Sequence, residues 1–506
     1  MSAYYQTLLT LNFVVFALAL GGIGAIHQVV SGAAGTRVPR LALVGRRVSI
    51  FVGLSILNFG ICLVGSVLLA TDHDLLPGLD LQTDKVLASP VTGVVVGGLT
   101  LFTVVVAVFA VIRAATALSP AGSAVIITRS WQPMAGKHDL DADLGALADL
   151  ARKALVDGRD REYGRVLGTV DSALVRAGAL GDEHVLEVAT GLEEHFVPLA
   201  QESVLTGRPL RAADVAALAG KLAAHAPGRL GLLPFLRIEV LVGDLLFDRR
   251  SATALARVMA DIRNIGELAL AESDGNASLV FDEACRSMGA IGERTPATFL
   301  DPGDPEVLMT PGVVGVEGPM GKLVEGWVAL FNAAYPLGAS APLVDLLVWR
   351  DGLMRSTQAL VIRIDERFQD DRLEAPLIQL AGTLAHAGIR AAGDDQWKTV
   401  SIVIPALGAL AEHSSDDFYL EYPNELASWL MQIGMCAEED NAAVAGVGVL
   451  AEIAANHLAT HLAAYCQRQA MELNGAGTMS PVSPDARTAF IKRLGTKLGS
   501  SPGLDP

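Results

Sequence analysis

Three long apolar runs dominate the first quarter of the chain. They span Leu8–Val30, Val48–Ala70 and Val91–Ile112, and none of them contains Asp, Glu, Lys or Arg. The third run is 22 residues long, and about 20 helical residues are enough to cross the hydrocarbon core of a bilayer. The pattern therefore predicts three transmembrane helices, at about 8–30, 48–70 and 91–112, within an N-terminal membrane domain of residues 1–118.

The short connections between these runs carry opposite charges. Residues 31–47 hold four arginines and no acid, whereas residues 71–85 hold four aspartates and one lysine. Arg113 directly follows the third run. Because short basic loops stay on the cytoplasmic side of a membrane, we predict a multi-pass protein of the inner or plasma membrane. Its N-terminus would lie outside and its large C-terminal domain in the cytoplasm.

Small and polar residues recur along one side of each apolar run. In lipid, small residues let helix backbones approach, and polar side chains form hydrogen bonds between helices. These positions favour a packed three-helix bundle, and the alternative is a pore lined by several copies of the chain. The candidates for helix packing or pore lining are Gly21, Gly24, His27, Gln28, Ser55, Asn58, Cys62, Ser66, Gly93, Gly97 and Thr100.

The rest of the chain has a helical pattern of apolar residues. Residues 119–140 form a predicted juxtamembrane connector, residues 141–473 an α-helical domain, and residues 474–506 a flexible tail with one short basic helix. Spacings of three and four residues, typical of a packed helix face, are clearest in one stripe, and Pro198 and Gly207–Pro209 are expected to break that helix. The stripe consists of Val185, Ala189, Leu192, Phe196 and Leu199.

A Pro/Gly-rich stretch at residues 292–321 interrupts the helical domain. Prolines remove backbone donors and disfavour a continuous helix, so the preceding helix, predicted at Ser278–Met288, should end before this stretch. The chain is thus predicted to be an all-α membrane protein with three N-terminal transmembrane helices. Its large cytoplasmic domain would be either a solenoid or an irregular helical bundle.

The charge of the chain limits the choice of partner. The formal net charge is −17, and the acidic excess lies entirely beyond residue 118, because residues 1–118 carry six basic and four acidic side chains. An acidic domain repels the phosphates of nucleic acids. The expected partners are therefore the lipid bilayer and either another protein or further copies of this chain, with no nucleic acid.

Short sequence motifs give little support for nucleotide binding or catalysis. Gly315–Leu323 resembles a phosphate-binding loop, but it is one residue too long, contains Pro319 and ends in Leu323 where the motif needs a hydroxyl. The GxSxG match at residues 499–503 falls in the predicted flexible tail, away from the strand-to-helix turn that this motif needs.

Two groups of ionisable residues are further candidates. His457 and His461 are four residues apart and could ligate zinc from one side of a helix, although Leu458 stands where a hydrolytic site needs Glu. A surface or core histidine pair is the preferred interpretation. Glu193, Glu194 and His195 are expected on the solvent-exposed side of the helix that carries the apolar stripe.

These observations favour a function without catalysis. No catalytic motif was found, so we predict that the protein is not an enzyme and needs no cofactor. The favoured hypothesis is a membrane-anchored helical scaffold or sensor that binds a protein partner through its cytoplasmic domain. The alternatives are a homo-oligomeric channel gated by that domain and, third, a membrane-bound enzyme of unknown chemistry.

Overall fold

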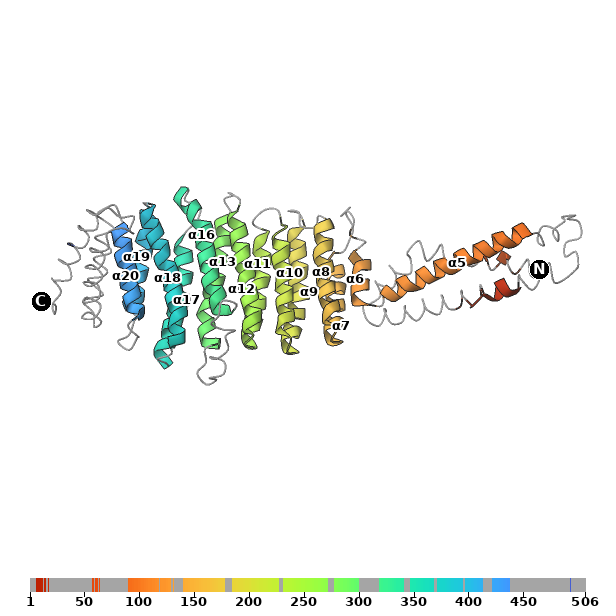
Figure 1. Cartoon of the computed structure of the whole chain (residues 1–506), viewed down its shortest axis with the longest axis horizontal. Coiled ribbons are helices and arrows are strands. Elements are labelled where there is room, and N and C mark those ends of the chain that lie inside the picture. Colours follow the sequence, from red (N-terminus) through yellow and green to blue (C-terminus); the bar gives the residue numbers. More distant parts are fainter. Residues whose placement is uncertain are drawn as a thin grey trace, which may run out of the picture. The chain divides into compact units, whose positions relative to one another are not determined.

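The computed structural model describes a chain built of helices (Figure 1). It describes short pieces within residues 6–17 and 57–63, then residues 90–117, 119–128, 131, 140–177, 184–226, 231–271, 277–299, 318–340, 346–367, 371–394, 396–412, 421–436 and 492. Within these ranges every regular element is a helix, which confirms the prediction of an all-α protein. The chain divides into two compact units, Met1–Ala179 and Leu180–Pro506. This division falls inside the helical domain predicted at residues 141–473.

The first unit contains a small group of three mutually packed helices. α6, α7 and α8 all contact one another, and α5 contacts α6. The face that α7 buries includes Leu144 and Leu147, while α8 contributes Tyr163 and Val166, all of them fully buried. Acidic residues in the first turn of α7 and Lys153 in its last turn complement the helix dipole. The described helices of this unit are α5 (Pro90–Ala117), α6 (Pro120–Thr128), α7 (Leu140–Val156) and α8 (Asp160–Ala177).

The described residues of the predicted connector at 119–140, which are 119–128, 131 and 140, are part of this packed group. It contains α6, whose Ala124 and Ile127 are at most 1% exposed. Trp131 is equally buried, and its indole Nε1–H donates a hydrogen bond to Oδ2 of Asp143 at 2.9 Å. The connector is therefore fixed to α7 by an apolar contact surface and a buried hydrogen bond.

The described parts of the three apolar runs meet around α5. Leu8 and Leu9, from the first run, pack against Val96 of α5, and Asn58, from the second run, lies beside Thr100. The coloured pieces of residues 6–17 lie alongside α5 in Figure 1. Among the residues that the structure describes, no helix has both the length and the apolar content that crossing a membrane requires.

The second unit is a stack of helices joined mostly by short connections. Its described helices are α9 (Val185–Leu205), α10 (Pro209–Ala223), α11 (Leu232–Asp248), α12 (Ala252–Leu270), α13 (Ala277–Phe299), α16 (Pro319–Ser340), α17 (Leu346–Arg367), α18 (Asp371–Gly393), α19 (Trp397–Glu412) and α20 (Glu421–Cys436). In Figure 1 they follow one another in chain order along the stack.

The contacts between these helices define two layers. Each helix touches its neighbours in the chain and also the next helix but one. One layer consists of α9, α11, α13, α17 and α19, and the other consists of α10, α12, α16, α18 and α20. This is the nearest-neighbour arrangement of helical repeat proteins, in which each pair of helices buries its apolar face against the adjacent pairs. Of the two architectures predicted for this region, the solenoid-like one describes this unit better.

The apolar stripe of α9 is buried as predicted, but the predicted break at Pro198 is wrong. The five stripe residues are at most 6% exposed, with Phe196 and Leu199 fully buried. Pro198 lies inside α9 and is exposed, so its ring faces solvent while the stripe packs on α10 and α11. The helix ends at Leu205, just before the predicted break at Gly207–Pro209. The φ of +75° at Gly207 allows Arg208 N–H to bond to the Ser203 carbonyl at 2.8 Å, the glycine-terminated cap that often ends helices.

The predicted end of the helix at Met288 is also wrong. α13 continues through Pro296 to Phe299, so the first part of the Pro/Gly-rich stretch is helical. The reason is tertiary packing against α17. A Cβ atom on Gly292 would lie only 2.0 Å from Oγ of Ser356, so the two helices approach closely at this point. Contacts of this kind outweigh the local cost of the proline, which is about 3 kcal/mol in an unsupported helix.

Candidate functional site

The most unusual buried group in the described structure is the carboxyl of Glu239. It lies in the middle of α11, within the apolar stripe formed by Leu232, Phe235, Val242 and Leu246, and its side chain is 0% exposed. Among the described residues, neither Oε1 nor Oε2 has a hydrogen-bond partner. An isolated carboxylate is very costly to remove from water, and it responds by taking up a proton.

A second carboxyl group lies directly beside it. Asp261 of α12 and Glu239 of α11 both approach Gly220 of α10. A Cβ atom placed on Gly220 would lie 3.1 Å from Oε1 of Glu239 and 3.3 Å from Cγ of Asp261. The absence of a side chain at Gly220 therefore lets two carboxyl groups from two helices meet against the backbone of a third. Asp261 is partly exposed and so connects the pair to solvent.

The surroundings of the pair favour its protonated forms. Burial raises the pKa of Glu239 well above its ordinary value of 4.5, the nearby charge of Asp261 raises it further, and the backbone N–H of Gly220 acts in the opposite direction. Burial also raises the pKa of Asp261, from 3.8 to about 6, against the opposing charges of Lys221, Arg263 and Arg257. Like charges in one low-dielectric site cannot both ionise without cost. The arrangement can therefore store a proton near neutral pH.

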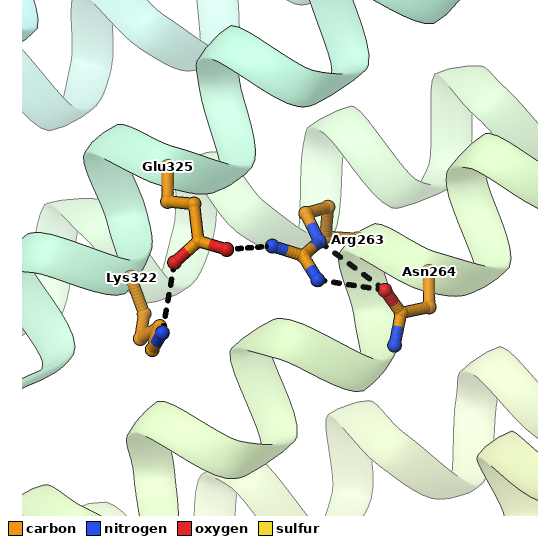
Figure 2. Close-up of polar contacts among 4 residues, drawn as sticks. All are labelled: Arg263, Asn264, Lys322 and Glu325. Carbon is orange, nitrogen blue, oxygen red and sulfur yellow. Dashed lines mark hydrogen bonds and ion pairs between the residues drawn. The ribbon is translucent and has the colours of Figure 1, made fainter. Parts of the chain in front are cut away.

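Arg263 is close to the pair, but its guanidinium group is engaged by other residues. Figure 2 shows Arg263 of α12 directed toward Glu325 of α16, with which it forms an ion pair, and toward Asn264. Lys322 approaches the same carboxylate from the first turn of α16, with Nζ 2.8 Å from Oε2 of Glu325. Hydrogen bonds from Lys322 and then Arg263 hold the pKa of Glu325 below its ordinary value. This partly exposed network joins α12 to α16.

Two of the polar candidates in the apolar runs are brought together. Nδ2 of Asn58 donates a hydrogen bond to Oγ1 of Thr100 at 3.3 Å, and Thr100 Oγ1 in turn donates to the carbonyl of Val96 at 2.9 Å. Asn58 is 0% exposed and Thr100 is 2% exposed. This pairing within one chain favours the packing role over the pore-lining role for these two residues.

The other candidates are placed less fully. Gly97 is partly buried on α5, and Gly93 lies on the same helix. The remaining candidates of the apolar runs and the histidine pair lie outside the described residues. These are Gly21, Gly24, His27, Gln28, Ser55, Cys62, Ser66, His457 and His461.

Two other predicted groups can be examined directly. Gly321–Leu323, the end of the phosphate-loop-like stretch, lies in the first turn of α16, and Lys322 is paired with Glu325 as described above. On α9, Glu194 is exposed, as expected for a solvent-facing position. Glu193 is only partly exposed and forms a salt bridge with Arg237 of α11, at 3.0 Å, so it contributes to the contact between two helices.

Sequence reasoning missed Glu239, although a signal was present. Leu232, Phe235, Glu239, Val242 and Leu246 follow one another at steps of three, four, three and four, so an acid occupies a core position of an amphipathic helix. Asp261 and Gly220 carry no comparable signal, because nothing local shows that α10, α11 and α12 meet at these three residues.

Comparisons with known proteins add little. No protein-family model and no curated protein matches the sequence. One solved structure that resembles the chain is described as a circular tandem repeat protein with novel repeat topology and enhanced subunit contact surfaces. It shares 14% identity, the alignment covers 96% of each chain, and the TM-score is 0.36. A likeness this weak carries no argument about this chain, so no family is assigned.

Proposed function

We propose that the protein is a membrane-anchored helical scaffold that binds a protein partner through its second unit on the cytoplasmic side. The observation that carries the anchoring is the exposed apolar surface of α5. Val91, Val94, Val95, Leu101 and Phe102 are each between 54% and 74% exposed. Contiguous exposed apolar surface in a folded protein marks contact with a partner or a membrane, and the uncharged run Val91–Ile112 suits the hydrocarbon of a bilayer.

The contacts among the apolar runs support a multi-pass arrangement. Leu8 and Leu9 near the start of the first run pack on Val96 near the start of the third, so these two runs begin at the same end. Asn58, about midway along the second run, contacts Thr100, about midway along the third. A protein that crosses a bilayer three times, with its first and third segments running in the same direction, requires this register.

The two-layer stack supports the scaffold part of the proposal. Helical repeat stacks present long continuous surfaces along their layers, and proteins of this architecture use such surfaces to bind other proteins. The formal charge of the chain is −17, with the acidic excess beyond residue 118. The partner surface would therefore be expected to carry basic groups that complement it.

Membrane extraction tests the anchoring. The full chain should remain in the membrane pellet after alkaline washing and should be released only by detergent. Leu101→Arg should reduce its recovery from the membrane, because a charge near the centre of a span costs about 2.5–3.5 kcal/mol. Leu101→Ala is the matched control and should behave like the wild type. Complete release by alkali alone would refute membrane anchoring.

The oligomeric state tests the channel alternative. Three apolar runs per chain could line a pore only in a ring of several copies, so the detergent-purified full chain should be monomeric or dimeric if it is a scaffold. A stable larger ring that conducts ions in a planar bilayer would replace the scaffold proposal with the channel.

A further inference from the structure

We propose that Glu239 and Asp261 form an internal proton-binding site that couples the packing of α10, α11 and α12 to pH. This goes beyond the scaffold proposal and does not depend on it, because the site is built from α10, α11 and α12 alone and involves neither a membrane nor a protein partner. The ligand of the site is the proton. Its acceptors are two carboxyl groups from different helices that converge on Gly220.

The geometry requires a ligand for Glu239. Its carboxyl is 0% exposed and has no hydrogen-bond partner of good geometry among the described residues, so an ionised Glu239 would be a buried charge that only the nearby Gly220 backbone helps to stabilise. Such a charge is costly unless it is paired or neutralised. Binding of a proton neutralises this charge and removes its cost to the packed core.

In the described part of the chain, the other helices around α11 supply no cation that acts on Glu239. On α10 and α12 the nearby cations are Lys221, Arg257 and Arg263, and all three act on the more exposed Asp261. Of these, Arg257 also pairs with Asp214 of α10 at 3.7 Å, and Arg263 pairs with Glu325. Asp214 and Glu325 thus compete for two of the cations that would otherwise stabilise an ionised Asp261.

The remaining two neighbours of α11 are α9 and α13, and they use different residues of α11. Glu193 of α9 pairs with Arg237, and Arg294 of α13 pairs with Asp244. Among the described residues, the cations Arg237 and Arg294 therefore have acidic partners other than Glu239. The proton therefore competes with no protein cation for this carboxyl.

The direction of the pH dependence follows from the raised pKa values. In the unfolded chain the two groups titrate near their ordinary pKa values of 4.5 and 3.8, and in the folded protein they hold their protons to higher pH. The folded state then binds more protons than the unfolded state, so its stability falls as pH rises. The loss begins as pH rises above the ordinary values of 3.8 and 4.5; for Asp261 it is complete once pH passes about 6, and for Glu239 it continues up to its higher folded pKa.

Infrared spectroscopy of the detergent-purified full chain tests proton occupancy directly. At pH 7 the wild type should show the C=O stretch of a protonated carboxylic acid, and this band should disappear as pH is raised. Glu239→Gln should remove the band at pH 7. Glu193→Gln, a matched change in the salt bridge between α9 and α11, should leave it intact. If Glu239→Gln does not fold, Asp261→Asn should keep the band but move its titration, because it removes the coupled charge.

Thermal unfolding supplies the second readout. The melting temperature of the wild type should fall as pH is raised from about 5, just above the ordinary carboxyl pKa values, and Glu239→Gln should reduce that fall, so that the variant gains most at the alkaline end. A wild type without the protonated band at pH 7 would overturn the proposal. So would a band abolished by adding calcium or magnesium together with a rise in melting temperature, since the pair would then be a cation site.

Discussion

Gly289 of α13 and Gly352 of α17 bring two helix backbones into direct contact. A Cβ atom on Gly289 would lie 2.8 Å from Cα of Gly352, and one on Gly352 would lie 2.5 Å from Cη2 of Trp327. The Trp349 indole N–H donates to the Trp327 carbonyl at 3.0 Å, which ties α17 to α16 at the same level. Three helices from both layers of the second unit thus pack closely at the point where α13 and α17 each have a glycine.

This contact predicts that a single methyl group at Gly352 destabilises the protein. Gly352→Ala should lower the free energy of unfolding by about 1–3 kcal/mol, because the methyl group would overlap the ring of Trp327 and the Cys285 carbonyl. Gly168→Ala on α8 is the control, since a Cβ there would meet nothing within 4 Å. It should be neutral or stabilising by up to about 1 kcal/mol. Chemical denaturation of the full chain measures both, and equal effects would contradict the close approach.

Phe196 is predicted to be a major contributor to the core of the second unit. Its ring is fully buried on α9, so Phe196→Ala should cost about 3–5 kcal/mol through the cavity that it leaves. Glu194→Ala, on the exposed side of the same helix, should change stability by less than about 0.5 kcal/mol. Glu193→Ala should cost up to about 1 kcal/mol, because it removes a partly exposed salt bridge to Arg237. Melting curves that rank Glu194 with Phe196 would disprove this assignment of the helix faces.

Trp131 is predicted to stabilise the contact between the connector and α7 within the first unit. Trp131→Phe keeps an aromatic ring but removes the N–H that bonds to Asp143, and it should lower stability by about 1–3 kcal/mol. A double-mutant cycle with Asp143→Ala, which removes the acceptor, measures the coupling between the two residues. The cost of Trp131→Phe should be smaller in the Asp143→Ala background, and an unchanged cost would mean that the hydrogen bond adds nothing.

Asn58 and Thr100 are predicted to be energetically coupled. Asn58→Leu and Thr100→Val each remove one partner of the 3.3 Å hydrogen bond, and hydrogen bonds between helices in lipid contribute about 0.6–2 kcal/mol. The double variant should therefore be destabilised by less than the sum of the two single variants in detergent unfolding. Additive effects would argue against the contact and would leave both side chains available for another role, such as lining a pore.

Thiol labelling is expected to report the proposed topology. In a background with the four native cysteines replaced, Ser2→Cys should react with an impermeant reagent in intact cells, and Ser500→Cys should react only after lysis. The reason is the contrast between the arginine-rich and aspartate-rich connections. The opposite labelling pattern would place the second unit outside the cell and refute the cytoplasmic assignment.

Local patterns in the sequence were sufficient for the all-α class and for much of the core. The stripe from Val185 to Leu199 follows the period of a helix, and this spacing arises whenever one side of a helix is buried. Gly207 ends α9 because a left-handed residue is needed there and glycine adopts it without strain. The uncharged runs and the opposite charges of their connections can also be read directly from the sequence, and the membrane proposal is based on them.

Tertiary structure decided where helices continue and where the buried acidic pair lies. Pro198 and Pro296 are local breakers, yet both lie inside helices, because packing against neighbouring helices outweighs the cost of one proline. Glu239 was visible as an acid in an apolar stripe, but its neighbours were not. The convergence of Gly220, Glu239 and Asp261 depends on the register of three helices, and that register is set by contacts between residues up to 41 positions apart, which no local pattern encodes.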